Sequence, residues 1–354
     1  MKYKPDWEIV KAKYEAWWRG EELARPLLQV TARLPEKPGA RPPKDPGTNE
    51  RRFTDIDYAM ERTIYEFERT YFAAEAFPCF WPNFGPDFMG AVMGASLEFG
   101  ENTSWAIPVY ESLKGADIKF DENNAYFRRM EAFSREVAKN APGNYIYGIT
   151  DLHPSLDALC AICGVENLMA ELINEPETVL KALKQTENVF DELYERLLNV
   201  GLEYQPGGST STLQVWSGGR YFPNVCDVIY MISPEMFDTF ARPTIEHELD
   251  LLDDTIIHVD GVGSLNHLDS ILRLEKLKAV QWVYGEGQPS ARHWPEVYKK
   301  ICESGKMVYV GGPPDDIEDI LRVVEPSKLI YATSQPDKER ADEYIKWVER
   351  ICAG

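Results

Sequence analysis

The sequence predicts an α/β protein built as a (β/α)8 TIM barrel with an N-terminal helical extension. Three observations lead to this fold class: short apolar runs recur along the C-terminal third, helix-like stretches separate them, and polar residues follow each run. Strands that alternate with helices at roughly 25-residue spacing form parallel βα units with right-handed crossovers. We therefore expect a single domain over residues 1–354, with the extension at residues 1–24.

The C-terminal strands are the clearest elements. They are expected at Thr255–Val259, Ala279–Val283, Met307–Val310 and Leu329–Ala332. The helices after them are expected at Ser264–Arg273, Trp294–Glu303, Asp315–Val324 and Asp337–Ile351. Several of these stretches open on Asp, Ser or Pro, the residue types favoured at helix starts.

Weaker strand signals upstream complete a set of eight. They lie at Leu27–Thr31, Pro78–Trp81, Tyr145–Ile149 and Thr212–Trp216. Helices are expected at Asp6–Glu22, Asp55–Ala76, Glu122–Asn140, Pro176–Gly201 and Pro234–Asp253, and a long loop at Leu34–Gly47. The rival fold, an open doubly wound sheet, needs a phosphate-binding glycine turn after its first strand, and neither GxGxxG nor GxxxxGK[ST] occurs there.

Composition narrows the possible partners and the compartment. The formal charge of -20 and pI near 4.8 argue against binding nucleic acid or an anionic membrane surface. The N-terminus has no apolar signal region, and no run of about 18 apolar residues exists to span a bilayer. Six cysteines are too sparse for a disulfide framework, so we expect a cytoplasmic protein.

Polar and aromatic residues gather where the expected strands end. His258 and Asp260 are the strongest candidates, because residues two apart on a strand point to the same face. The carboxyl ends of barrel strands are where barrel enzymes place catalytic groups. The other candidates, for substrate binding, are Arg33, Asn83, Asp151, His153, Trp216, Arg220, Gln281, Trp282, Glu286 and Gln335.

Several short motifs together resemble the uroporphyrinogen decarboxylase superfamily, and most closely its methyltransferase-like branch. The motifs are Trp216-Ser-Gly-Gly-Arg220, Cys226-Asp227, Ile232-Ser-Pro-Glu-Met-Phe237, His258-Val-Asp-Gly261, His267-Leu-Asp269 and Val280-Gln-Trp-Val-Tyr-Gly-Glu-Gly287. The resemblance runs from about Arg25 to the end of the chain. It implies a TIM barrel with a deep mouth.

The resemblance implies one of two chemistries. Porphyrinogen decarboxylases carry an arginine-rich first strand and a tyrosine after the third, whereas this chain keeps only Arg33 and has Cys160 near the tyrosine position. The sequence therefore favours the other chemistry, in which a methyl group moves between a small methylated compound and a corrinoid protein or cobalamin.

Members with that activity bind zinc through a His-x-Cys pair and a later cysteine. Here the pair reads His258 and Asp260, and Thr333–Pro336 near the last strand holds no cysteine. A Zn²⁺ site formed by His258, Asp260 and Glu286 is the expectation, since zinc accepts imidazole nitrogen and carboxylate oxygen. Such a site suits an ether, alcohol or water better than a thiol.

Other interpretations stay open at the level of sequence. Without a metal, His258 and Asp260 would serve as acid and orienting base. A decarboxylase or lyase would grip a non-porphyrin carboxylate with Arg33 or Arg220. A barrel that has lost catalysis would bind a small ligand or a corrinoid protein as a partner module. His258 is also explained as a barrel-core histidine whose ring bonds to Asp260 or to a backbone carbonyl.

Simple packing is the competing interpretation for several other candidates. It applies to Trp216 and Trp282, and more strongly to the Cys160-Ala-Ile-Cys163 pair, which lies in an apolar helical run. Asp151 and Arg220 are as well explained by a mutual ion pair as by substrate binding.

Overall fold

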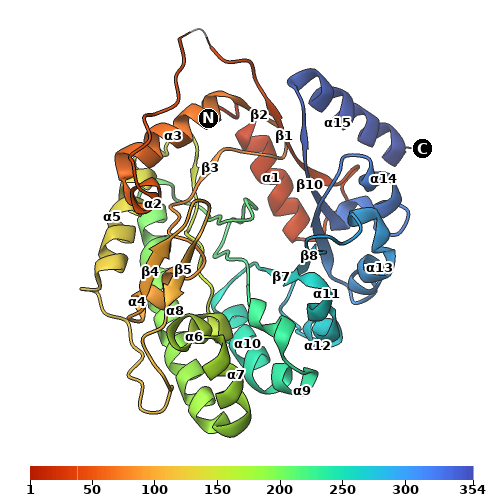
Figure 1. Cartoon of the computed structure of the whole chain (residues 1–354). Coiled ribbons are helices and arrows are strands. Elements are labelled where there is room, and N and C mark those ends of the chain that lie inside the picture. The colour runs from red at the N-terminus through yellow and green to blue at the C-terminus, as the bar shows by residue number, and fades with distance from the viewer. Residues whose placement is uncertain (38, 354) are drawn as a thin grey trace.

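The computed structural model describes residues 1–37 and 39–353, and places the strands inside a shell of helices (Figure 1). The strands are β1 (Leu27–Arg33), β2 (Thr70–Ala74), β3 (Cys79–Phe80), β4 (Ser96–Phe99), β5 (Ser104–Ile107), β6 (Ile146–Tyr147), β7 (Ile256–Asp260), β8 (Ala279–Val283), β9 (Met307–Gly311) and β10 (Leu329–Gln335).

The α-helices vary from single turns to 29 residues in α8. They are α1 (Trp7–Trp18), α2 (Asn49–Thr54), α3 (Ile56–Glu68), α4 (Phe88–Val92), α5 (Ala125–Asn140), α6 (Ser155–Cys163), α7 (Val165–Asn174), α8 (Pro176–Tyr204), α9 (Pro234–Met236), α10 (Arg242–Leu251), α11 (Gly261–Ser264), α12 (Leu268–Leu272), α13 (Pro295–Glu303), α14 (Asp316–Ile320) and α15 (Lys338–Ala353). None of them, within the described part of the chain, has the length and apolar character needed to cross a membrane.

The fold is mixed α/β with a mostly parallel central sheet. Its six strands have the order β2-β1-β10-β9-β8-β7, and only the β1–β2 pair is antiparallel. A second parallel pair joins β3 to β6. The ladders of the described residues do not join into a closed ring, so the predicted α/β class is confirmed and the closed barrel is not.

Two upstream expectations were wrong. Thr212–Trp216 forms no strand, because the chain turns back there with Gln214 at φ +53° and its N–H bonded to the Ser211 carbonyl at 2.9 Å. The expected helix Asp55–Ala76 ends at Glu68, and the next residues form β2, where tyrosine and phenylalanine favour the extended chain. The β4–β5 hairpin was also not predicted.

Strand alternation gives the main sheet an inner and an outer face. His258, Gln281 and Tyr309 are paired in register across β7, β8 and β9, so their side chains share the inner face. Neighbouring positions such as Val259 and Trp282 point outward and are buried against the helices. This register places the His258 imidazole inside the strand arrangement.

Helix α1 covers the amino-terminal ends of the strands. Its buried aromatic residues Trp7, Tyr14 and Trp17 form one apolar cluster with residues from the beginnings of several strands. Those strand residues are Leu27, Ile256, Ala279, Met307 and Ile330. The packing of α1 therefore involves the amino-terminal ends of these strands and leaves out their carboxyl-terminal ends.

Candidate functional site

His258 and Asp260 lie on the last residues of β7 and face the inside of the sheet. The Nδ1 atom of His258 is 2.5 Å from Oε1 of the buried Gln281 on β8. Its other ring nitrogen, Nε2, lies 3.8 Å from Oδ2 of Asp260. Gln281 therefore holds the ring from one side and leaves Nε2 directed at the carboxylate.

A second histidine, His153, lies in the segment between β6 and α6. His153 Nε2 is 3.2 Å from Asp151 Oδ2, and its Nδ1 is 3.4 Å from Oδ2 of Asp157 on the first turn of α6. Ser155, the first residue of α6, has φ +62°, an unfavourable conformation for a residue with a side chain. Its hydroxyl lies 2.6 Å from that of Thr244, which fixes the turn.

Asp227 connects the two histidine regions. Its backbone N–H and that of Val228 donate to the two Asp157 oxygens at 2.8 and 2.9 Å, which ties this turn to α6. The Asp227 carboxylate then lies 4.0 Å from His153 Nδ1. Two groups with metal-ligand spacing result, His153–Asp157–Asp227 and Asp227–His258–Asp260, in each of which the ligand atoms lie within 4.8 Å of one another.

The electrostatics of the cluster reflect this crowding of acids. Burial lowers the pKa of His258, but Asp260, Gln281 and Asp227 outweigh it and raise the pKa above its usual value. The pKa of His153 is also raised, because Asp151 and Asp157 outweigh burial. Burial and the charge of Asp157 raise the pKa of Asp227. The acids therefore favour a cation at each imidazole, either a proton or a metal ion.

A cavity of about 440 Å³ opens beside Asp227 and Asp260. Its rim carries exposed apolar side chains, among them Tyr230, Met231 and Val262. The Tyr230 ring packs closely on α11, the short helix after β7. A Cβ added at Gly263 of this helix would lie 2.8 Å from the ring. The cavity thus joins a polar cluster to an apolar rim, a combination typical of small-molecule sites.

Glu286 belongs to the rim of this cavity and is exposed. It is in neither of the two groups with metal-ligand spacing among the described residues, and Asp227 takes the third position beside His258 and Asp260. Gln335 ends β10, where it is paired with Ala32 of β1.

Both arginines proposed for binding a carboxylate are engaged elsewhere. Arg33 is exposed and pairs with Glu66 at 2.7 Å. Arg220 pairs with Glu195 of α8, so the alternative of an Asp151–Arg220 pair is not what the structure shows. Neither guanidinium contributes to the histidine cluster.

The remaining candidates have structural contacts. Asn83 accepts the Gly85 N–H at 2.7 Å in a local turn. Trp216 packs edge-on against Trp7 of α1 at 5.3 Å, at the amino-terminal end of the strands. Trp282 points outward and meets Trp294, also at 5.3 Å.

The two clustered cysteines have protonated thiols. Burial raises the pKa of Cys160 to about 11 and that of Cys163 to about 12. Neither cysteine is close enough to a histidine or acid to join a group with metal-ligand spacing in the described residues. This agrees with the interpretation that they pack within α6.

Asp157 and Asp227 are the members of the cluster that were not among the sequence candidates. Asp157 follows His153 by four residues at a helix start, a spacing that brings the two side chains together. Asp227 stands in one of the motifs that carry the family resemblance. The spacing and the motif can both be seen in the sequence, but only the structure shows that Asp157 and the Asp227 turn are in contact.

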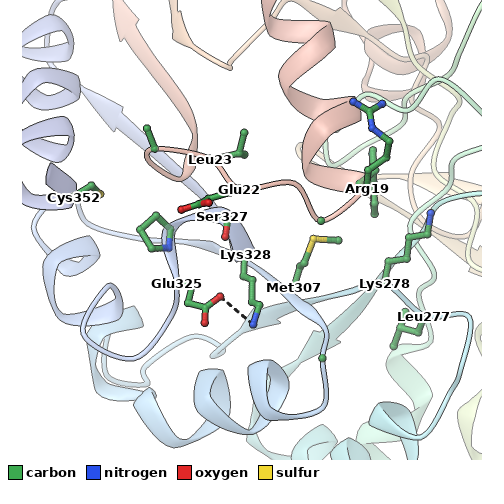
Figure 2. Close-up of a pocket in the computed structure, with 15 residues that line it drawn as sticks. Arg19, Glu22, Leu23, Leu277, Lys278, Met307, Glu325, Ser327, Lys328 and Cys352 are labelled. Atoms are coloured by element: carbon green, nitrogen blue, oxygen red, sulfur yellow. Dashed lines mark ion pairs between the residues drawn. The ribbon is translucent and has the colours of Figure 1, made fainter.

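A cavity of about 800 Å³ lies at the opposite end of the sheet, between the C-terminus of α1 and the beginnings of β8, β9 and β10 (Figure 2). Three of its charged side chains are engaged in ion pairs: Lys328 pairs with Glu325 at 3.1 Å, and Lys278 pairs with Asp254. Among the described lining residues there is no histidine and only one cysteine. We place the functional site at the histidine cluster for this reason.

Comparisons with solved structures show a relationship in fold. No protein-family model matches the sequence, and no curated protein matches it. Among solved structures, the chain is similar to a methyltransferase from Methanosarcina mazei, with a TM-score of 0.63 and 12% sequence identity over 98% of this chain and 99% of that one. The two proteins share a fold along nearly their whole lengths.

Proposed function

We propose that this chain is a metal-dependent methyltransferase, which moves a methyl group between a small methylated compound and a corrinoid protein or cobalamin. The observation that carries the proposal is the convergence of His258, Asp260 and Asp227 at the carboxyl ends of the strands, in a fold shared with a methyltransferase. The proposal includes membership of the uroporphyrinogen decarboxylase superfamily, to which the motifs around these residues are similar.

An irregular (β/α)8 barrel is part of the same proposal. Single backbone bonds continue the strand arrangement beyond the regular ladders: Ile149 N–H donates to the Thr210 carbonyl, and Asn224 N–H to the Ile256 carbonyl, both at 2.9 Å. These two bonds and the β3–β6 pair connect several of the segments that lie between β1 and β7 in the chain. In a barrel of this kind, the cluster lies at the catalytic mouth.

The residues at the cluster fit a divalent metal. His258 Nε2 and the carboxylates of Asp260 and Asp227 give one nitrogen and two oxygen ligands, a set that Zn²⁺ accepts and that leaves a position for substrate. A bound metal would act as a Lewis acid on an oxygen of the substrate. Gln281 orients the imidazole, and the apolar rim around Tyr230 shields the methyl group from water.

Two other functions remain as outcomes of a test. In a metal-free enzyme, His258 would deliver a proton to the leaving oxygen while Asp260 orients it. A module that only binds a ligand would need neither residue for turnover. The decarboxylase alternative is weaker, because Arg33 and Arg220 are paired with glutamates away from the cluster.

The experiment is a screen of methoxylated compounds and methylamines with cob(I)alamin as acceptor. Formation of methylcobalamin, followed by its visible spectrum, is the expected result. The variant His258→Ala should lower the rate by about 100-fold or more, whereas His293→Ala, a change at an exposed histidine, should not. Ligand binding without methyl transfer in any combination would contradict the proposal.

A further inference from the structure

We propose that the cluster holds two metal ions, bridged by Asp227. The first position is the one already described, with Asp227, His258 and Asp260 as ligands. The second is formed by Asp227, His153 and Asp157. This inference rests on the metal-binding part of the proposed function and does not depend on methyl transfer.

The geometry of the two groups supports a shared carboxylate. In each group the ligand atoms lie within 4.8 Å of one another, and Asp227 is the only residue common to both. A zinc ion binds nitrogen and oxygen ligands at about 2.0–2.2 Å, so one ion can be held by the three ligand atoms of one group. A carboxylate has two oxygens, so Asp227 can bind one ion with each, and paired ions in enzymes lie about 3.5–4 Å apart.

Each histidine is oriented as metal-binding histidines are. His153 has an acceptor, Asp151, behind Nε2 at 3.2 Å, which leaves Nδ1 directed at Asp157 and Asp227. His258 has Gln281 behind Nδ1, which leaves Nε2 directed at Asp260. An acceptor behind a ring fixes its proton on the far side and presents a lone pair to the metal. Two separate histidines show this same arrangement around one carboxylate.

The charge balance points to cations between these groups. Asp151, Asp157, Asp227 and Asp260 lie together, and within the described residues none of the four pairs with a lysine or arginine. A carboxylate packed against other carboxylates is destabilised unless a positive charge lies nearby. Two divalent ions would balance the four negative charges.

The ligand set also indicates the class of substrate. Two imidazole nitrogens and three carboxylates form a hard, oxygen-rich site, which suits Zn²⁺ or Mn²⁺ and a substrate that binds through oxygen. The apolar side chains of Tyr230, Met231 and Val262 lie at the rim of the cavity beside this site. A methoxylated compound, with an ether oxygen and an apolar methyl group, matches both parts.

Metal stoichiometry provides the test. The full-length protein is freed of metal with a chelator, titrated with Zn²⁺ in a calorimeter, and its metal content is measured after desalting. Two ions per chain are expected, falling to one in His153→Ala and to one in His258→Ala. Asp227→Asn should weaken binding at both positions by at least tenfold, and the exposed control His293→Ala should keep two ions.

Loading with Mn²⁺ gives a second readout. Two manganese ions that share a carboxylate should give a spin-coupled paramagnetic resonance spectrum, which His153→Ala converts to that of an isolated ion. Asp157→Asn serves as a milder variant, because its amide oxygen can still accept one of the two N–H groups of the Asp227 turn while the charge is lost. Circular dichroism of each variant confirms that it is folded.

Each outcome decides between the proposals. One ion per chain that His153→Ala leaves unchanged would overturn the second position and leave the first intact. No bound ion in any variant would overturn both metal positions. Two ions bound, with the losses expected in the variants but no methyl transfer, would support this inference and overturn only the proposed function.

Discussion

Replacement of Gln281 by leucine should weaken metal binding at His258. Gln281 is buried, and its Oε1 atom lies 2.5 Å from His258 Nδ1. Leucine has a similar size but no acceptor, so the ring would lose the group that fixes its proton and its orientation. Loss of such a partner typically costs 10–100-fold in metal affinity, or about 1.4–2.7 kcal/mol.

The assay is a competition titration of Zn²⁺ against a chromophoric chelator, carried out on the parent and on Gln281→Leu. The matched variant Gln281→Glu restores an acceptor at the same position and should bind zinc at least as tightly as the parent. Equal zinc affinity in the parent and in Gln281→Leu would refute the reasoning. It would mean that the contact between Gln281 and His258 contributes to packing within the sheet and does not orient the imidazole for metal binding.

Four further predictions concern stability, metal content and the cavity. Arg25→Ala should destabilise the fold by about 3 kcal/mol, measured by urea unfolding, because it removes two bonds to the buried Glu75, at 2.7 and 2.9 Å, and leaves that carboxylate only Lys13 and the Leu28 N–H. Burial raises the pKa of Glu75, but Arg25 and Lys13 outweigh it and hold it below the usual value. The stability from this carboxylate is therefore complete above its unfolded pKa of about 4.3 and is lost as the pH falls through the lower folded value. A Glu75→Gln variant that kept the parent's acid unfolding profile would contradict this. Glu286→Gln should leave the bound metal content unchanged, since Glu286 is in neither ligand group, and a lost ion would disprove that assignment. Tyr230→Ala, a change at an exposed ring, should alter the melting temperature little but raise KM for the methyl donor severalfold, and an unchanged KM would place the substrate elsewhere.

The regular part of the sheet could be predicted because its sequence follows simple rules. The strands β7 to β10 are apolar runs with glycine or charged residues at their ends, and they lie close to their expected positions. The segment from Ser209 to Asn224 follows no such pattern. Hydroxyl groups there replace a ladder: Ser211 Oγ donates to the Ile149 carbonyl at 2.9 Å and Thr210 Oγ1 to that of Val215 at 2.8 Å. Hydrophobic periodicity does not reveal bonds of this kind.

In the candidate site, too, some residues could be predicted from the sequence and others could not. His258 and Asp260 could be found because strand alternation fixes which side chains share a face. Asp157 and Asp227 could not, because their position depends on bonds from the Asp227 and Val228 N–H groups to a carboxylate 70 residues earlier in the chain. Nothing local in either segment encodes that contact, so it appears only once the helix and the turn are packed together.

The aromatic helix α1 has a consequence for biosynthesis. It is synthesised before all the strands that it covers, and the surface it covers includes Met307 of β9 and Ile330 of β10. Contacts this distant in sequence form slowly, because the chain loses the entropy of a long loop before the contacts contribute favourable free energy. Part of the surface of Trp7, Tyr14 and Trp17 therefore stays exposed until β9 and β10 have been made, and in the nascent chain this aromatic surface is available to chaperones.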